Sequence, residues 1–199
     1  MSDLFEEKAH DWDMNTLVQQ LSSGIGQSIK NNVALNDSMQ VMDFGAGTGL
    51  ISGHVAPSVN KITAVDISAS MLEQLAEKAE LQGKVSVACQ DILEQPLADQ
   101  FDLIISAMAM HHVEDTKALF NTFASHLKQG GQLALADLDK EDGTFHPADI
   151  EGVFHHGFDR DELESIVLAA GFNNIAFTTA HIVNKEEKQY PVFLLTAEK

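Results

Sequence analysis

Hydrophobic residues recur every three or four positions in several stretches of the chain, which is the period of a helix buried along one face. Leu17, Leu21, Ile25 and Ile29 form such a face within residues 14–30. The same period predicts four more helices: residues 49–58, residues 69–83, a segment that passes through Phe120, Phe123, Ala124 and Leu127 and is closed by Gly130 and Gly131, and residues 159–172.

Between these helices, short runs rich in β-branched and other apolar residues predict strands. The expected strands are residues 39–44, 61–68, 84–91, 101–106, 131–138, 174–183 and 190–199. Strands that alternate with helices form parallel βαβ units, in a sheet covered on both faces. Only residues 184–189 separate the last two strands, too few for a parallel crossover, so these two should pair antiparallel. The pattern predicts an α/β fold with a doubly wound, seven-stranded, mostly parallel sheet and an antiparallel last strand.

The connection between the fifth strand and the last helix, residues 139–158, has no clear hydrophobic period. It is rich in charged residues, glycine and histidine, so we expect an ordered loop or a short helical insert. Asp159 and Glu162 have the spacing of a capping box, which indicates that the last helix begins there. A chain of 199 residues is long enough for one well-buried domain, so residues 1–199 are expected to form a single domain.

The charge balance restricts the class of partner. The chain has 12 Lys and Arg residues against 30 Asp and Glu residues, a net charge of −18. Such a chain repels phosphate backbones and anionic membranes, so neither nucleic acid nor a membrane is expected as a partner. Cys89 is the only cysteine, and the first residues lack the pattern of a signal peptide, so a cytoplasmic location is expected.

A glycine-rich loop follows the first strand, within the stretch VMDFGAGTGLISG at residues 41–53. Gly45 and Gly47 allow a tight turn and a close approach of a ligand to the backbone. The helix that follows offers free N–H groups and a partial positive charge. These features alone suit any nucleotide-like ligand, including a nicotinamide dinucleotide or a nucleotide phosphate.

Three details of this loop narrow the choice. A dinucleotide fingerprint needs a small residue three places after the second glycine, but Leu50 stands there. A phosphate-binding P-loop needs a lysine, and this loop has none. Asp43 would repel a pyrophosphate, whereas it would favour a cationic ligand without phosphate, such as one that carries an amino group and a sulfonium.

The loop DFGAGTG, together with AVDIS, CQDI, FDLIISAMAMHHVED and LKQGGQLALAD in that order, resembles the motifs of the class I S-adenosylmethionine-dependent methyltransferases. The resemblance extends roughly from Phe5 to Ala197 and is closest to the small-molecule branch typified by ubiquinone and menaquinone C-methyltransferases. It implies a Rossmann-like fold in which Asp66 binds the ribose hydroxyls, Asp91 faces the adenine amino group and Ile92 packs on the adenine ring. The cofactor site implied by the resemblance consists of Asp43, Gly45, Ala46, Gly47, Gly49, Asp66, Ile67, Met71, Asp91, Ile92 and Ser106.

The methyl acceptor is expected at the same edge of the sheet, where ligands of open α/β sheets bind. His111 and His112 directly follow the fourth strand, and His155 lies in the insert over the predicted cleft, so these three are the candidate catalytic residues. The alternative is that the paired histidines are structural or pack on the cofactor.

The resemblance also implies that residues 1–30 form a helical cap or lid over the cofactor. Within it, Phe5 or Trp12 would lie near the sulfonium and add a cation–π interaction, or Trp12 would simply pack on the first helix. His146, His155 and His156 lie near Asp149, Glu151 and Asp159, but their spacing is irregular, so no metal site is expected.

The favoured function is transfer of a methyl group from S-adenosylmethionine to a small-molecule acceptor. A nicotinamide-dependent oxidoreductase is one alternative, against which Leu50 and the reversed last strand both count. A non-catalytic S-adenosylmethionine-binding protein is another, because methyl transfer from a sulfonium requires no obligatory catalytic residue.

Overall fold

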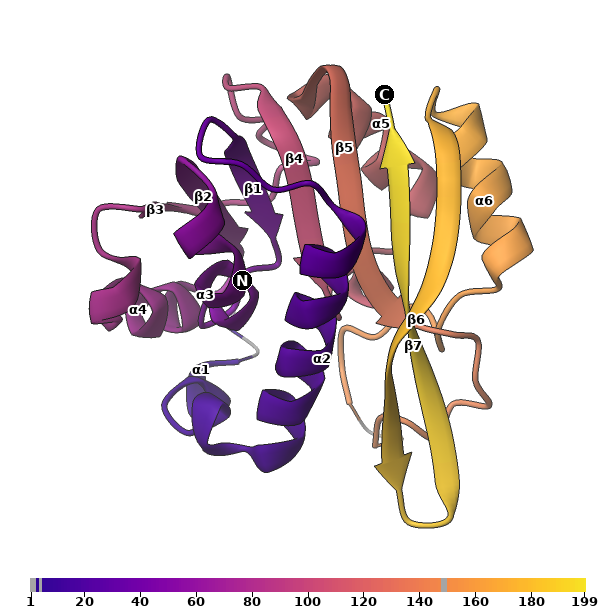
Figure 1. Ribbon diagram of the computed structural model, residues 1–199. Coiled ribbons are helices and arrows are strands. Elements are labelled where there is room, and N and C mark those ends of the chain that lie inside the picture. Colours follow the sequence, from indigo (N-terminus) through magenta and orange to yellow (C-terminus); the bar gives the residue numbers. More distant parts are fainter. Residues whose placement is uncertain (1–2, 4, 148–149) are drawn as a thin grey trace.

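A single seven-stranded sheet forms the centre of the protein in the computed structural model, which describes residue 3 and residues 5–147 and 150–199 (Figure 1). The strand order is β3-β2-β1-β4-β5-β7-β6. Strands β1 to β5 pair in parallel, and β7 pairs antiparallel with both β5 and β6. The predicted α/β fold, with its reversed last strand, is therefore confirmed.

The sheet strands lie close to the segments expected from the hydrophobic pattern. They are β1 Gln40–Phe44, β2 Lys61–Asp66, β3 Val85–Cys89, β4 Phe101–Ala107, β5 Leu127–Leu138, β6 Asn173–Lys185 and β7 Lys188–Glu198. The helices are α1 Glu6–Ala9, α2 Thr16–Asn32, α3 Leu50–Val55, α4 Ala69–Glu77, α5 Thr116–His126 and α6 Arg160–Ala169, with short 3₁₀ turns η1 Trp12–Met14, η2 Ala56–Ser58, η3 Ala79–Leu81 and η4 Met110–His112.

Each face of the sheet carries its own hydrophobic core, because successive residues of a strand point to opposite faces. On one face, Val41 packs in a cluster with Ile25 and Ile29 of α2. On the other face, Met42 packs in a cluster with Phe120 of α5 and Val167 of α6. The side chains in these clusters are almost fully enclosed, so helices on both sides fix the positions of the strand ends.

Two helices end at least four residues before the predicted end. The helix expected over residues 69–83 ends at Glu77, because Lys78 takes an extended backbone conformation and a short 3₁₀ turn follows. The helix expected to close at Gly130 and Gly131 ends at His126. Strand β5 starts directly afterwards, where Leu127 pairs with Phe101 of β4. Both boundaries coincide with a contact between residues distant in sequence. At the end of α4, Lys78 pairs with Asp13, and after α5, Leu127 pairs with Phe101.

Two irregular segments lie at the edge where the parallel strands end. The N-terminal segment, residues 3 and 5–14, contains α1 and η1, and the insert joins β5 to α6 (Figure 1). The described residues of the insert form no helix, although Asp139 bridges Phe158 at its two ends. Asp159 caps α6 by accepting hydrogen bonds from the N–H groups of Asp161 and Glu162, as its spacing predicts. None of the helices in the described ranges is long and apolar enough to cross a bilayer.

Candidate active site

The glycine loop between β1 and α3 brings three glycines into left-handed backbone conformations, with φ of 65° at Gly45, 53° at Gly47 and 79° at Gly49. A side chain at Gly45 would overlap Ala109, and one at Gly49 would press on Leu75. At Gly47, in contrast, a Cβ would meet nothing within 4 Å. Gly45 and Gly49 are therefore packed against the protein itself, whereas Gly47 offers bare backbone to a ligand.

Asp66, at the end of β2, is held beside this loop by backbone groups. One carboxylate oxygen accepts the N–H of Gly47 at 2.7 Å, and the other accepts the N–H of Ser68 at 2.9 Å. Burial raises the pKa of Asp66, although these backbone hydrogen bonds act in the opposite direction. Each oxygen keeps a further lone pair, so the carboxylate has the capacity to accept two hydroxyl groups.

Asp43 lies beneath the loop and is enclosed, with 1% of its surface exposed. Its carboxyl group accepts the hydroxyl of Ser52 at 2.7 Å. Burial, with repulsion from Asp66, raises the pKa of Asp43 to about 7, and the hydrogen bond from Ser52 offsets part of this effect. Ser106 is also enclosed and donates its hydroxyl to the carbonyl of Phe44 at 2.8 Å. The predicted cofactor contacts of Asp43 and Ser106 remain predictions.

The remaining predicted cofactor residues follow β2 and β3, except for Ala46 in the glycine loop, which is nearly buried. Ile67 is 65% exposed, an unusual position for an isoleucine. Asp91 is exposed and accepts the N–H of Leu93 at 2.8 Å in a turn. Ile92 and Met71, in contrast, are enclosed, and Ile92 belongs to the core that contains Met42. Thus Ile67 and Asp91 present exposed side chains at the edge of the sheet, whereas Ile92 is buried and anchors the turn that Asp91 begins.

Two aspartates of the N-terminal segment fasten it to the loops around the glycine turn. Asp3 accepts hydrogen bonds from the hydroxyl of Ser68 at 2.9 Å and from the hydroxyl and N–H of Ser70 at 2.7 and 3.1 Å. Asp13 accepts the hydroxyl of Thr48 at 2.6 Å and pairs with Lys78. The sequence analysis missed both anchors, since each joins residues that are distant in sequence.

Of the two aromatic residues in the N-terminal segment, Phe5 contacts a histidine that follows β4. The ring of Phe5 packs edge-on against Trp12, with centroids 6.0 Å apart, and against His112 at 5.9 Å. Trp12 therefore packs within the segment, and Phe5 covers the ring of His112. Whether either ring lies near a sulfonium remains a prediction.

A cluster of three histidines and one aspartate lies beyond β4 and β5. Asp137, fully enclosed at the end of β5, accepts Nδ1–H of His111 at 2.8 Å and the N–H groups of His111 and Leu138. The ring centroid of His111 lies 4.2 Å from that of His112 and 4.9 Å from that of His146 in the insert. Asp139, one residue beyond the end of β5, pairs with Arg160 instead.

The histidines of this cluster differ in their surroundings. His112 donates Nδ1–H to the carbonyl of Gly152 at 2.6 Å, and burial followed by repulsion from His111 lowers its pKa. Burial, with repulsion from both other histidines, lowers the pKa of His146 to about 4. Nδ1 of His146 is enclosed and has no hydrogen-bond partner among the described residues. His146 was not among the catalytic candidates, because its proximity to His111 depends on the path of the insert.

His155, the third catalytic candidate, lies apart from the cluster. Its Nε2 lies 3.0 Å from the carbonyl of Val113 and 3.3 Å from the hydroxyl of Thr116, so it ties the insert to the start of α5. His156 faces Glu141. Asp149 lies outside the described residues. Within the described ranges, no group of three or more histidine, cysteine or carboxylate side chains is arranged to hold a metal ion.

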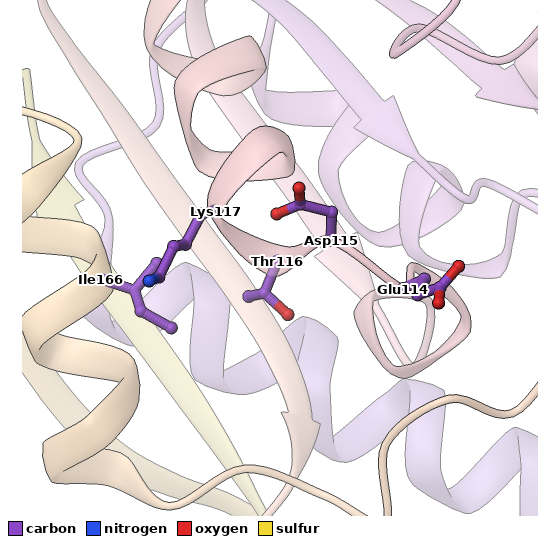
Figure 2. A pocket seen from close by; sticks show the side chains of 5 residues that line it. All are labelled: Glu114, Asp115, Thr116, Lys117 and Ile166. Carbon is purple, nitrogen blue, oxygen red and sulfur yellow. The ribbon is translucent and has the colours of Figure 1, made fainter.

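A hollow of about 550 Å³ lies between the start of α5 and α6 (Figure 2). It is shallow and is lined by Glu114, Asp115, Thr116, Lys117 and Ile166. None of these residues belongs to the glycine loop or the histidine cluster. We therefore assign the site to the edge formed by the glycine loop, Asp66 and His111, and not to this open surface.

Comparison with known proteins agrees with this geometry. Residues 41–131 match a family described as a methyltransferase domain. An uncharacterized methyltransferase of Schizosaccharomyces pombe is 31% identical over 174 residues, which are 79% of this chain and 60% of that protein. A ubiquinone biosynthesis O-methyltransferase of Coxiella burnetii is 31% identical over 102 residues, which are 50% of this chain and 44% of that protein. Residues 41–131 of the chain are thus similar to a methyltransferase domain.

A solved structure shows how far the likeness of fold extends. The N-methyltransferase NodS of Bradyrhizobium japonicum, in complex with S-adenosylhomocysteine, superposes with a TM-score of 0.73 over 99% of this chain and 94% of that chain. At 16% identity, this likeness shows the fold alone. The chain spans less than two thirds of the length of either curated relative named above.

The cofactor of the family, S-adenosylmethionine, fits the residues of this chain. Gly47 leaves space where any other residue would place a side chain, and Asp66 has unused acceptor capacity beside it. No lysine or arginine stands in the glycine loop, which agrees with a ligand that lacks phosphate. The exposed Ile67 supplies an apolar surface of the kind that an adenine ring covers.

Proposed function

We propose that this protein transfers the methyl group of S-adenosylmethionine to a small-molecule acceptor at the edge formed by the glycine loop, Asp66 and His111. The observation that carries the proposal is the pairing of Gly47, whose Cβ direction is open, with a carboxylate that its own N–H holds in place. This pairing suits an adenosyl ligand without phosphate. Residues Asp43, Ile67 and Asp91 would contribute the further contacts predicted from the sequence.

Each part of the chain has a defined task in this proposal. When bound, S-adenosylmethionine supplies an activated methyl group on a sulfonium. Asp66 would hold the ribose hydroxyls, and the backbone at Gly47 would lie against the ligand. The protein orients the acceptor and excludes water, and such positioning contributes roughly 7–11 kcal/mol to lowering a bimolecular barrier.

Charge and enclosure both favour a small acceptor. The net charge of −18 opposes binding of nucleic acid or another polyanion. Phe5 covers His112 from one side, and the insert approaches the same ring through the carbonyl of Gly152. A macromolecule would have to displace both segments to reach His111, whereas a small molecule needs only a narrow opening.

Calorimetry with S-adenosylmethionine and S-adenosylhomocysteine tests the cofactor half of the proposal. We expect micromolar binding by the wild type and none detectable for Asp66→Ala, while the exposed-surface variant Asp11→Ala binds as the wild type does. The absence of binding by a folded wild type would overturn the proposal. A nicotinamide-dependent oxidoreductase would instead bind NADH, which a fluorescence titration detects.

Transfer of radiolabelled methyl from S-adenosylmethionine to different acceptor classes tests the other half. We expect label in small metabolites and none in DNA, RNA or a mixture of proteins. Label confined to a macromolecule would contradict the small-molecule assignment. Binding of the cofactor without transfer to any acceptor would favour a non-catalytic role.

A further inference from the structure

The insert reaches the histidine cluster through its tip, residues 146–147 and 150–153. Between these residues and the rest of the described chain there is one hydrogen bond, from Nδ1 of His112 to the carbonyl of Gly152 at 2.6 Å. A second contact is aromatic, because the ring of His146 packs against the two histidines that follow β4, with centroids 4.9 and 6.3 Å away. Both contacts pass through the histidine cluster, so the state of the cluster determines whether the tip stays in place.

The parts of the insert on either side of the tip are fastened without the rings of the cluster. Before the tip, Lys185 of β6 donates to the carbonyl of Phe145 at 2.5 Å. After the tip, His155 donates its N–H to the carbonyl of His111 at 3.2 Å, and its Nε2 lies 3.0 Å from the carbonyl of Val113. Loss of the ring contacts therefore releases the tip alone, between two fixed points.

A single carboxylate is in contact with the three rings of the cluster. Asp137 is fully enclosed and bonds Nδ1 of His111 at 2.8 Å, so its negative charge balances at most one proton on the rings. A second proton, on His112 or His146, would have no counter-ion in contact among the described residues. Two positive charges on rings whose centroids are 4.2 to 6.3 Å apart repel each other in such an enclosed place.

The remaining charged groups near the two outer rings do not remove this cost. Asp137 of β5 and Glu141 of the insert favour a proton on His146, but their effects are smaller than that of burial. Lys8 of α1 disfavours a proton on His112. Burial, followed by repulsion from the neighbouring histidines, lowers the pKa of both rings, and that of His146 falls from 6.5 to about 4. In the docked tip His146 is therefore uncharged at neutral pH.

We propose that the tip of the insert is an acid-sensitive switch that separates from the sheet edge when His146 takes up a proton. A protonated His146 is repelled by the rings of His111 and His112, whereas in the separated tip water surrounds the charge. Because His146 binds a proton more tightly in the separated tip, the docked population falls as the pH falls. Separation uncovers the rings that follow β4. The inference concerns the insert itself and holds whether or not the proposed function does.

Limited proteolysis with endoproteinase Glu-C tests this switch, because Glu151 lies in the tip. Cleavage after Glu187, in the turn between β6 and β7, is the internal reference for the activity of the protease at each pH. The lowered pKa of His146 predicts that the ratio of cleavage after Glu151 to cleavage after Glu187 rises about 20-fold from pH 7 to pH 5 in the wild type. An unchanged ratio would overturn the proposal.

Two histidine variants identify the group that responds to acid. His146→Gln removes the titrating ring and should keep the ratio constant between pH 7 and pH 5. His156→Gln is the matched control, because His156 lies in the same insert, has 61% of its side chain exposed and faces Glu141 instead of the cluster. This variant should show the wild-type rise. A rise that persists in His146→Gln, or one that is lost in His156→Gln, would show that His146 is not the switch.

Cleavage after Glu73 distinguishes separation of the tip from unfolding of the whole protein. Glu73 lies in α4, which follows β2 and belongs to another part of the fold. Cleavage after Glu73, relative to cleavage after Glu187, should stay constant between pH 7 and pH 5. A parallel rise after Glu73 and Glu151 would mean that acid unfolds the protein as a whole, and the proposal would be wrong.

A pH titration followed by nuclear magnetic resonance needs no variant. In the wild-type protein, labelled with ¹⁵N and with ¹³C in the histidine rings, the amide signals of Gly152 and Val153 should move with the same midpoint as the ring signal of His146. The midpoints coincide because protonation and separation are one event in this proposal. Amide signals that stay in place while the ring of His146 takes up its proton would overturn it.

Discussion

At the β1–β3 end of the sheet edge, Asp66 is held by the N–H groups of Gly47 and Ser68, whereas at the β4–β5 end His111 is held by the side chain of Asp137. The first end is built from backbone in short turns. The second is built from side chains that come together through the insert. Backbone turns are dictated by local sequence, so the proposed cofactor half of the site is readable from glycine spacing, whereas the proposed acceptor half depends on long-range packing.

The largest expected effect separates the two halves directly. Asp66→Asn should weaken binding of S-adenosylhomocysteine about 100-fold, because hydrogen bonds to a charged group contribute roughly 1.5–3 kcal/mol each. Asp137→Asn should leave this affinity within about threefold while it lowers turnover. Calorimetry and a methyl-transfer assay measure the two quantities. Equal loss of affinity in both variants would show that the halves are not independent.

The glycine loop offers a second contrast, within the donor half. Gly45→Ala and Gly47→Ala both place alanine at positive φ, which costs roughly 1–2 kcal/mol in each. The new methyl group overlaps Ala109 only in Gly45→Ala, so this variant should have a lower melting temperature than Gly47→Ala. Gly47→Ala should instead lower cofactor affinity about tenfold, because its methyl group points into the open space that the cofactor is proposed to occupy. Scanning calorimetry and titration of S-adenosylhomocysteine distinguish the two losses.

A pH series tests the buried carboxyl beneath the loop. The pKa of Asp43 is about 7 in the folded protein, against 3.8 for the free side chain. The folded state therefore binds more protons between these values, and stability falls as pH rises from about 4 to 7, by at most about 4 kcal/mol from this group. Asp43→Asn should flatten this slope in urea unfolding measured across that pH range.

Asp11→Asn serves as the control for this series, because Asp11 is a surface residue with 71% of its side chain exposed. It should leave the pH slope of stability as it is in the wild type. A slope that Asp43→Asn does not change would show that Asp43 is ionised in the folded protein at neutral pH.

The smallest expected effect concerns the N-terminal segment that joins the two halves. Asp3→Ala removes three hydrogen bonds to Ser68 and Ser70, so trypsin should cleave after Lys8 about five to ten times faster. Trypsin should cleave the Asp11→Ala variant, which is altered in the same segment, at the wild-type rate. Saturating S-adenosylhomocysteine should slow cleavage of the wild type more than that of Asp3→Ala. Identical rates in all variants would contradict the anchoring role of Asp3.

The hydrophobic pattern was sufficient for the order of strands and helices and for the reversed last strand. The length of residues 184–189 alone excluded a parallel pairing of β6 and β7. The hydrophobic pattern was not sufficient to predict the end of α4 or the start of β5. Those boundaries coincide with contacts of Lys78 and Leu127 to residues far along the chain, which no local period records.

The candidate site divides in the same way. The glycine loop, Asp66 and Asp91 follow strands in sequence, and the structure places all of them at one edge of the sheet. The pairing of Asp137 with His111 and the position of His146 depend on how the insert folds back. A sequence motif marks the first group, whereas the second contains only common residue types at irregular spacing.

Ser68 shows how the anchors of the N-terminal segment affect binding. Its N–H supports Asp66, and its hydroxyl holds Asp3. Thr48, which is bound by Asp13, belongs to the same loop as Gly47. A ligand that orders these loops therefore favours the docked segment, and by thermodynamic reciprocity the docked segment must raise affinity for that ligand by the same factor. The N-terminal segment, through Asp3 and Asp13, thus acts as a second, intramolecular ligand of the same loops.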